Sequence, residues 1–528
     1  MNSKTMKTTK HNVQRLLLAV MLLGMAACTG DFADINRNPN EVTDEQLQAN
    51  NYKVGTNLKT LQGLVVPTQE HMYQFLESLV GGPYAGYIGA TVDTWQNKFE
   101  TFNPSADWNQ GPYNTMFLDI YGNLFEIEEL SQGSGHWMAI ANLIRAAVMI
   151  RVADIYGPIP YSQVMKGLMY VPYDTNEEVY KNIIAHLQNS ASTLYSYAQT
   201  YPSSKPMGSS DPIYAGDYAL WARLANSLTL RVAIRTNDKE SALQAIAHEA
   251  GMIETNAQNA MMSPGIQGNP YQLASVSWGD LRVNASIVDY MSGYKDPRMA
   301  AYFTKSTFPG YTDQYVGMRS GEADFDKTSV AAYSMPNLTS GTLLPVFVAA
   351  ETQFLLAEAA LKGWIDGGEA KAREYYEAGI RLSMEQYGIT DSDAVSKYLA
   401  DKTLTPAGHS NDPRGSKYTY DRKTTVKIAW EGETSTEKHL EQIITQKWIA
   451  NYPMGLEAWA EYRRTGYPEL APVIDNLSGG VVDSNRGMRR LAFPLSEKDQ
   501  NTTNYQNAVT MIGGTDTPAV DLFWTKKN

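Results

Sequence analysis

A long helix that ends abruptly is encoded by residues 140–160, IANLIRAAVMIRVADIYGPIP. Its apolar residues recur three or four positions apart, the spacing of one helix face, and they are Ile140, Leu143, Ile144, Ala147, Val148 and Ile155. Arg145 and Arg151 stand between them, and Gly157 followed by Pro158 stops the helix. The segment therefore predicts a mainly helical protein.

The same periodicity predicts more helices along the chain. They are expected over residues 177–197, after an N-cap at Asp217, and over 351–362, 369–384 and 437–451. Several are joined by short loops, which favours antiparallel helix pairs. Trp221, Trp448 and Trp459 fall on apolar helix faces, so we expect them in the core.

The N-terminus has the order of a secretory signal: basic residues, then the uncharged run 16–27, then Cys28, the only cysteine. As a helix this run would span about 18 Å, whereas a bilayer core measures about 30 Å. Small residues directly before a cysteine resemble a bacterial lipobox. We expect residues 1–27 to be removed and Cys28 to be lipidated. An ordinary cleaved signal peptide is the alternative.

Composition limits the classes of protein and of partner. The chain has 528 residues, 43% of them hydrophobic, so residues 28–528 can form one large composite domain. A single cysteine allows no intrachain disulfide. Removal of four basic residues with the signal changes the net charge from −12 to −16. Such an acidic chain has no electrostatic footprint for nucleic acid.

The sequence contains no recognisable catalytic or cofactor motif. It lacks a Gly-x-Ser-x-Gly elbow, a His-Glu-x-x-His pair, a P-loop and a Gly-x-Gly-x-x-Gly turn. Its seven histidines are scattered without metal-ligand spacing. Residues 34–45 have the oxygen spacing of a calcium loop, but Pro39 replaces the required glycine. We therefore expect a non-enzyme with no catalytic residue, no cofactor and no metal.

Several strings occur in one order along the chain: 31–40 DFADINRNPN, 151–161 RVADIYGPIPY, 224–235 LANSLTLRVAIR, 295–298 KDPR, 354–359 FLLAEA, 443–450 IITQKWIA, 463–468 RRTGYP and 489–494 RRLAFP. Together they resemble the SusD/RagB family of outer-membrane nutrient-binding lipoproteins. The resemblance implies about four tetratricopeptide-like helix pairs with long loops and short strands. It also implies a lipid-anchored protein on the outer membrane, facing outside, a glycan ligand and a SusC-like TonB-dependent transporter as partner.

Most residues in these strings are expected to be structural. Glu358 and Gln446 lie on predicted helices, and Arg463 and Arg464 lie at the end of one, where buried hydrogen bonds or helix-end charges would explain them. The string 296–298 reads as a turn with a local ion pair. These strings therefore do not identify a ligand site.

A glycan site needs flat aromatic rings for the apolar face of a sugar, and amides, carboxylates or arginine for its hydroxyls. Long loops carry both, and the candidates are Tyr84, Asp93, Trp95, Asn97, Trp108, Trp278, Tyr311 and Arg319. Trp95 is the strongest because polar residues flank it. Two structural alternatives remain: Trp108 covers the start of a helix near Tyr113, and Trp278 packs under its own loop.

Three competing functions remain at this point. The ligand could be a non-sugar nutrient such as a peptide. The protein could be a surface-attached glycan hydrolase, since carboxylates are plentiful and spacing alone cannot place two of them across a sugar. It could also be an assembly protein with no ligand site of its own.

Overall fold

The computed structural model describes residues 52–526. The expected signal peptide, Cys28 and the calcium-like segment 34–45 lie outside the described residues. Within the described part of the chain, no helix combines the length and the apolar character needed to cross a membrane.

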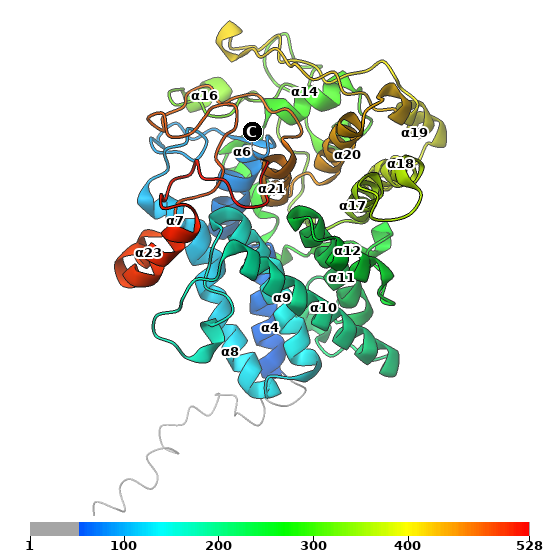
Figure 1. The fold of residues 1–528 in the computed structure, drawn as a ribbon. Helices are drawn as coiled ribbons and strands as arrows, with labels where there is room; N and C mark the ends of the chain where they lie inside the picture. Colours follow the sequence, from blue (N-terminus) through cyan, green and yellow to red (C-terminus); the bar gives the residue numbers. More distant parts are fainter. Residues whose placement is uncertain (1–51, 527–528) are drawn as a thin grey trace, which may run out of the picture. The chain divides into compact units, whose positions relative to one another are not determined.

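Helices dominate the molecule (Figure 1). The longer ones are α4 (Tyr52–Val65), α7 (Ala106–Tyr113), α8 (Asp119–Ser131), α9 (Gly135–Tyr156), α10 (Asn176–Thr200), α11 (Tyr218–Thr236), α12 (Lys239–Ala247), α14 (Ala285–Gly293), α17 (Ala349–Leu361), α18 (Gly368–Gln386), α19 (Ser392–Leu399), α20 (Thr436–Ala450), α21 (Gly455–Thr465) and α23 (Thr502–Met511). The mainly helical fold class is confirmed.

Short helical turns connect these elements. The α turns are α5 (Glu70–Tyr73), α6 (Gly82–Tyr84), α13 (Pro270–Gln272), α15 (Met299–Tyr302), α16 (Lys327–Val330) and α22 (Leu495–Gln500). The π turns are η2 (Gln74–Gly81), η3 (Asn114–Leu118) and η8 (Leu273–Ser277). The 3₁₀ turns are η4 (Val164–Lys166), η5 (Gly208–Ser210), η6 (Asn256–Gln258), η7 (Gly265–Gln267), η9 (Ser416–Tyr418) and η10 (Trp430–Gly432).

Four short strands form two antiparallel pairs among the described residues. β1 (Ile88–Ala90) pairs with β3 (Leu281–Val283), and β2 (Ala260–Met262) pairs with β4 (Leu344–Phe347). Both pairs join segments that are far apart in the sequence. The strands therefore fasten long loops onto the helical body rather than forming a layer.

The predicted helices form, and their ends follow the local chemistry. Gly157 ends α9 with φ +89°, a conformation that side-chain-bearing residues rarely adopt. The Asp217 carboxylate caps α11 by accepting hydrogen bonds from the N–H groups of Ala219 at 3.0 Å and Leu220 at 3.2 Å. Short loops join α8 to α9 and α20 to α21, as expected for helix pairs (Figure 1).

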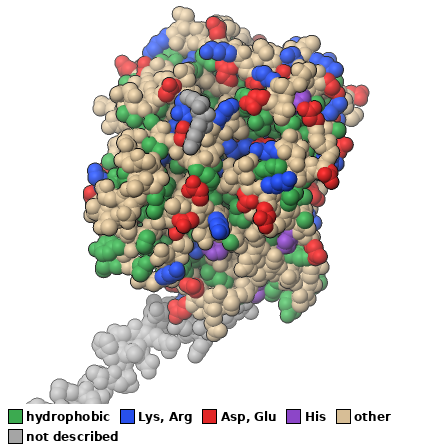
Figure 2. All heavy atoms as spheres, in the orientation of Figure 1, with side chains coloured by type: hydrophobic (Ala, Val, Ile, Leu, Met, Phe, Trp, Pro, Cys, Tyr) green, Lys and Arg blue, Asp and Glu red, His purple; other side chains and the backbone are tan. Residues whose placement is uncertain are grey.

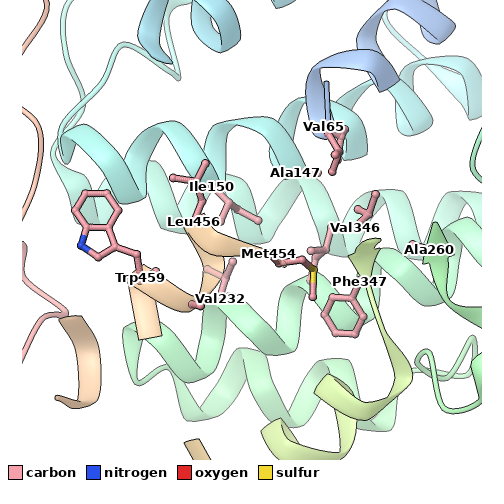
Figure 3. Packing of buried hydrophobic residues seen from close by; sticks show 14 of the residues in the cluster. Val65, Ala147, Ile150, Val232, Ala260, Val346, Phe347, Met454, Leu456 and Trp459 are labelled. Atoms are coloured by element: carbon pink, nitrogen blue, oxygen red, sulfur yellow. The ribbon is translucent and has the colours of Figure 1, made fainter. Parts of the chain in front are cut away.

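Packing of the helices produces one large apolar core. Figure 3 shows part of it, where side chains from α9, α21 and β4 meet. Trp221, Trp448 and Trp459 are all buried there, as their positions on helix faces predicted. On the face shown in Figure 2, acidic and basic side chains are interspersed with hydrophobic ones.

Charged side chains are also buried between the helices. Arg235 of α11 contacts the carboxylates of Asp154 at 2.7 Å and Glu457 at 2.5 Å. On the same network, Lys447 lies 3.2 Å from Glu461. Each of these five side chains is nearly inaccessible to solvent, so each charge depends on its neighbours for compensation.

The family-like strings contribute to this buried framework. Arg464 forms a two-pronged pair with Glu358, with both N–O distances 2.6 Å. Arg298 contacts Asp296 at 2.6 Å and donates to the Gln446 amide oxygen at 2.9 Å. The expected structural roles of these residues, and the expected local ion pair at 296–298, are confirmed.

Candidate functional site

The β1–β3 pair brings two distant loops to the same edge. Ala90, the last residue of β1, lies opposite Leu281, the first residue of β3. Because the strands are antiparallel, the segment that leaves β1 runs beside the segment that enters β3. The Thr91 N–H extends the pairing by donating to the Asp280 carbonyl at 2.8 Å. The loop that contains Trp95 is therefore adjacent to the loop that contains Trp278.

Lys327, at the start of α16, links the two loops. Its N–H donates to the Asp93 carboxylate at 2.9 Å. Its ammonium group donates to the Asp280 carboxylate at 2.5 Å and to the Trp278 carbonyl at 3.3 Å. One residue thus holds both aromatic loops against α16.

Five rings line this region, and we call them the aromatic face: His71, Phe75, Trp95, Trp108 and Trp278. Trp108 meets Trp95 edge to face at 5.1 Å between ring centroids and meets Phe75 at 6.0 Å. Trp278 stacks on His71 at 5.7 Å with 28° between the ring planes. His71 and Phe75 are four residues apart in the continuous α5–η2 segment, so they lie on one side of it.

The rings of the aromatic face are only partly covered. Trp278 is 36% exposed and His71 is exposed, whereas Phe75, Trp95 and Trp108 are half-buried. Each ring is thus packed on one side by another ring and open to solvent elsewhere. Such rings can stack on a flat apolar ligand surface with little further loss of side-chain entropy.

Local backbone chemistry sets the positions of two of these rings. The Ser105 hydroxyl accepts a hydrogen bond from the Trp108 N–H at 3.2 Å and caps α7, which begins at Ala106. The expected helix start near Tyr113 is therefore wrong, and Trp108 lies in the first turn of the helix. Gly279 has φ +69°, which lets the chain reverse directly after Trp278.

Polar groups accompany the rings. Asp93 and Asn97 are exposed on the Trp95 loop, and the Asn97 amide oxygen accepts from Asn103 at 3.4 Å. Beneath this loop, burial raises the pKa of the Glu100 carboxyl to about 7, although the Ala90 N–H donates to it at 3.1 Å. Glu100 is buried, so it supports the loop rather than facing solvent.

The other three predicted residues do not belong to the aromatic face. Tyr84 is buried, and its hydroxyl donates to the Phe99 carbonyl at 2.9 Å. Tyr311 is half-buried beside a small apolar cluster, and its hydroxyl donates to the Asn411 amide oxygen at 3.0 Å. Arg319 is buried and donates to backbone carbonyls.

Sequence reasoning missed three contributors: His71, Phe75 and Lys327. The four-residue spacing of His71 and Phe75 was readable as one helix face. The role of Lys327 depends on a contact across more than two hundred residues from Asp93, and no local pattern indicates it.

Within residues 52–526, no three His, Cys, Asp or Glu side chains are grouped so that they could hold a metal ion. What the face does offer is stacking surface with nearby carboxylate and amide groups.

Comparison with known proteins gives the family. The model of the SusD-like family, described as Susd and RagB outer membrane lipoprotein, matches residues 34–525. The chain belongs to the SusD-like family. The tetratricopeptide-containing helical fold expected for this family is thereby confirmed. No curated protein matches the chain.

Solved SusD-like structures cover nearly the same residues. A SusD homologue from Bacteroides uniformis is 39% identical, with 90% of this chain and 100% of that chain covered and a TM-score of 0.83. A homologue from Bacteroides ovatus is 36% identical, with 90% and 99% covered and the same TM-score. A chitin-binding SusD homologue from Flavobacterium johnsoniae is 32% identical, with 89% and 98% covered and a TM-score of 0.84.

Proposed function

We propose that this SusD-like protein binds a nutrient glycan at its aromatic face. The observation that carries the proposal is the set of partly exposed rings from three segments of the chain, with Asp93 and Asn97 exposed on the Trp95 loop. A pyranose ring presents an apolar C–H face that an indole can cover, while its hydroxyls need directional polar partners. The aromatic face supplies both kinds of group.

The expected affinity is modest. The site is open and shallow, so a ligand gains little from each atom after the cost of ordering is subtracted. We expect dissociation constants between about 1 mM and 1 μM, which correspond to favourable binding free energies of roughly 4 to 8 kcal/mol. The chitin-binding SusD homologue supports a glycan as the class of ligand for this chain. It does not indicate which sugar this chain binds.

The proposal includes a surface anchor and a transporter. The family description as an outer membrane lipoprotein supports lipidation at Cys28. The outward-facing location is what the family resemblance implies. Residues 29–51 would then join the anchor to α4. A SusC-like TonB-dependent transporter would receive the bound glycan, as the family resemblance implies.

Binding without catalysis separates this proposal from a glycan hydrolase. Prolonged incubation of the full-length protein with polysaccharide should release no new reducing ends. Release of reducing ends would favour the hydrolase alternative. Binding of peptides, with no binding of any sugar, would favour a peptide receptor.

A glycan-panel binding assay tests the site itself. The full-length protein, Trp95→Ala and Trp278→Ala are compared on the same immobilised glycans. Trp364→Ala is the matched control, because Trp364 is half-buried on the loop between α17 and α18 and does not belong to the aromatic face. Both face variants should lose binding and the control should keep it. Equal binding by all four proteins would overturn the proposed site.

A further inference from the structure

An open groove lies beside α7 and adjoins the aromatic face. It has a volume of about 490 Å³. Its walls include the first turn of α7, α22 and the loop around residue 481, and the lining residues used below are Asn103, Ala106, Asn109, Val481, Leu495 and Lys498. None of the five rings of the aromatic face lines this groove.

The first turn of α7 separates the groove from the aromatic face. Ala106 and Asn109 are three residues apart, so they lie on one side of the helix, and both line the groove. Trp108 projects from another side of the same turn, where its ring contacts Trp95 and Phe75. A helix with its side chains is about 10–12 Å across, so a ligand of a few sugar units can reach both surfaces.

The segment that precedes α7 borders both surfaces. The Asn97 amide oxygen accepts from Asn103, which lines the groove, at 3.4 Å in an exposed contact. The Phe99 ring stacks on Trp108 at 5.9 Å between centroids, whereas Phe102 lines the groove. The Phe102 N–H donates to the Phe99 carbonyl at 2.9 Å. A single tight turn therefore supports the aromatic face and the groove together.

Exposed aliphatic side chains line the groove. Val481 is 47% exposed and Leu495 is 41% exposed. Met488 and Phe493, which are buried, complete the apolar lining. Covering an aliphatic side chain completely is favourable by about 1.5–3 kcal/mol, so a ligand that covers part of each gains affinity.

Polar groups accompany these side chains. The Asn109 side-chain nitrogen donates to the Ala492 carbonyl at 2.7 Å, but its amide oxygen accepts no hydrogen bond among residues 52–526. The Lys498 ammonium is exposed and forms no ion pair within that part of the chain. The Asp516 carboxylate is already paired with Arg490 at 2.5 Å. One free acceptor and one free donor suit sugar hydroxyls, which both donate and accept.

We propose that this groove extends the glycan site and receives the sugar units beyond those stacked on the aromatic face. The inference rests on the proposed function. The glycan chain passes Asn103 at the start of α7, and its later units contact Val481 and Leu495. Their hydroxyls bond to Asn109 and Lys498. The ligand is therefore an oligosaccharide long enough to cover both surfaces.

Calorimetric titration of the full-length protein with glycans of two lengths tests the inference. The probes are linear oligomers of chitin, starch, xylan and laminarin, each as the dimer and as the hexamer. A hexamer contains about five overlapping dimers, so a gain of up to about fivefold needs no second surface. We expect at least one hexamer to bind more than tenfold tighter than its dimer.

The outcomes separate this inference from the proposed function. Dimers that bind, with a gain of fivefold or less in every hexamer, overturn the groove and leave the aromatic face intact. If no oligomer binds, the inference falls together with the proposed function. Tryptic casein peptides that bind when no hexamer gains affinity would make the groove a peptide site and would also overturn the inference.

Filling the groove connects the length dependence to it. Ala106 is exposed, and Ala106→Trp adds a ring there without removing a side-chain hydrogen bond. The hexamer should lose at least tenfold in affinity and the dimer should bind as in the wild type. Ala370→Trp is the matched control, since Ala370 is exposed in the first turn of α18, and it should change neither affinity. An unchanged hexamer affinity in Ala106→Trp, or an equal loss for the dimer, overturns the assignment.

A second pair of variants keeps the test valid if Ala106→Trp does not fold. Leu495→Ser removes an apolar wall of the groove and should weaken the hexamer several-fold while sparing the dimer. Leu343→Ser is its control, because Leu343 is 45% exposed and does not line the groove. Trp95→Ala, by contrast, should weaken dimer and hexamer alike. Equal hexamer affinities in the two leucine variants would count against the groove.

Discussion

The helical core and the aromatic face use bulky side chains in opposite ways. Between α9, α11 and α21, Arg235 is enclosed by carboxylates, and its exposed fraction is 2%. On the aromatic face, Trp278 packs one side on His71 and leaves 36% of its surface exposed. In the first arrangement, carboxylates of the protein itself compensate the charge of Arg235. The second leaves stacking capacity for something else.

This difference separates stability from recognition. Substitutions in the buried network should lower the free energy of unfolding, because the remaining partner would be a buried charge without compensation. Substitutions on the aromatic face should change ligand affinity, because the lost surface was already in water. Four experiments test that separation, beginning with the largest expected effect.

Arg235→Met should be the most damaging. It removes the cationic partner of Asp154 and one of the partners of Glu457, and breaking a buried pair typically costs about 3–5 kcal/mol. Urea unfolding should show a lower midpoint with an unchanged slope. Arg373→Met is the matched control, because the Arg373 pair with Glu377 is partly exposed and should cost less than about 1 kcal/mol. Equal losses in the two variants would contradict the comparison.

His409 gives a pH-dependent test in a loop. It is buried between Asp289 of α14 at 3.1 Å and Asp412 at 2.9 Å. Burial alone would lower the pKa of His409, but the two carboxylates raise it to about 9. The facing groups also include Arg422, 3.8 Å from Asp289, and Tyr333, whose hydroxyl donates to Asp412.

The raised pKa of His409 fixes the sign of the effect. Because it exceeds the unfolded value of about 6.5, the stabilisation is complete below pH 6.5 and is lost as pH rises through 9. The shift corresponds to about 3 kcal/mol at most. The free energy of unfolding should fall between pH 6.5 and 9 in the wild type and fall less in His409→Gln. Parallel pH curves would show that this imidazolium does not hold the loop.

The double variant Trp95→Ala/Trp278→Ala tests the aromatic face. Glycan affinity should fall at least tenfold, which is about 1.4 kcal/mol. The free energy of unfolding should change much less than in Arg235→Met, because both rings are partly in water. Calorimetric titration and urea unfolding of the same sample measure the two quantities. A large loss of stability with unchanged affinity would reverse the roles assigned to the two regions.

Gly279→Ala should have the smallest effect. A Cβ there would lie 3.9 Å from Arg282, an ordinary van der Waals contact, so only the positive φ is unfavourable. The expected cost is about 1 kcal/mol, with a few-fold loss of glycan affinity as the Trp278 loop shifts. Gly122→Ala in α8, where nothing lies within 4 Å, is the control and should be neutral or stabilising. Identical behaviour of the two variants would show that the reversal at Gly279 does not position Trp278.

Much of the helical framework was predictable because its signals are local. Apolar spacing identified α9, and the carboxylate of Asp217 identified the start of α11. Trp448 and Trp459 were recognised as core residues from the same spacing. In each case the neighbours within one or two turns decide the outcome.

The aromatic face was only partly predictable because long-range contacts assemble it. The loops of Trp95 and Trp278 meet through β1 and β3, whose pairing joins residues about 190 positions apart. Composition marked both tryptophans as candidates, yet it could not separate them from Arg319, which lies in the interior. The start of α7 was missed because Ser105 was not recognised as its cap.

His71 and Phe75 project from a single stretch of helix, α5 continuing into η2. Their separation along the axis is therefore fixed by the helical rise, at about 6 Å for four residues. The backbone positions of the two rings are therefore set together. A chain-like ligand that contacts both His71 and Phe75 meets a fixed spacing between them. The repeat length of the ligand therefore determines how well it fits, in addition to its affinity for each ring.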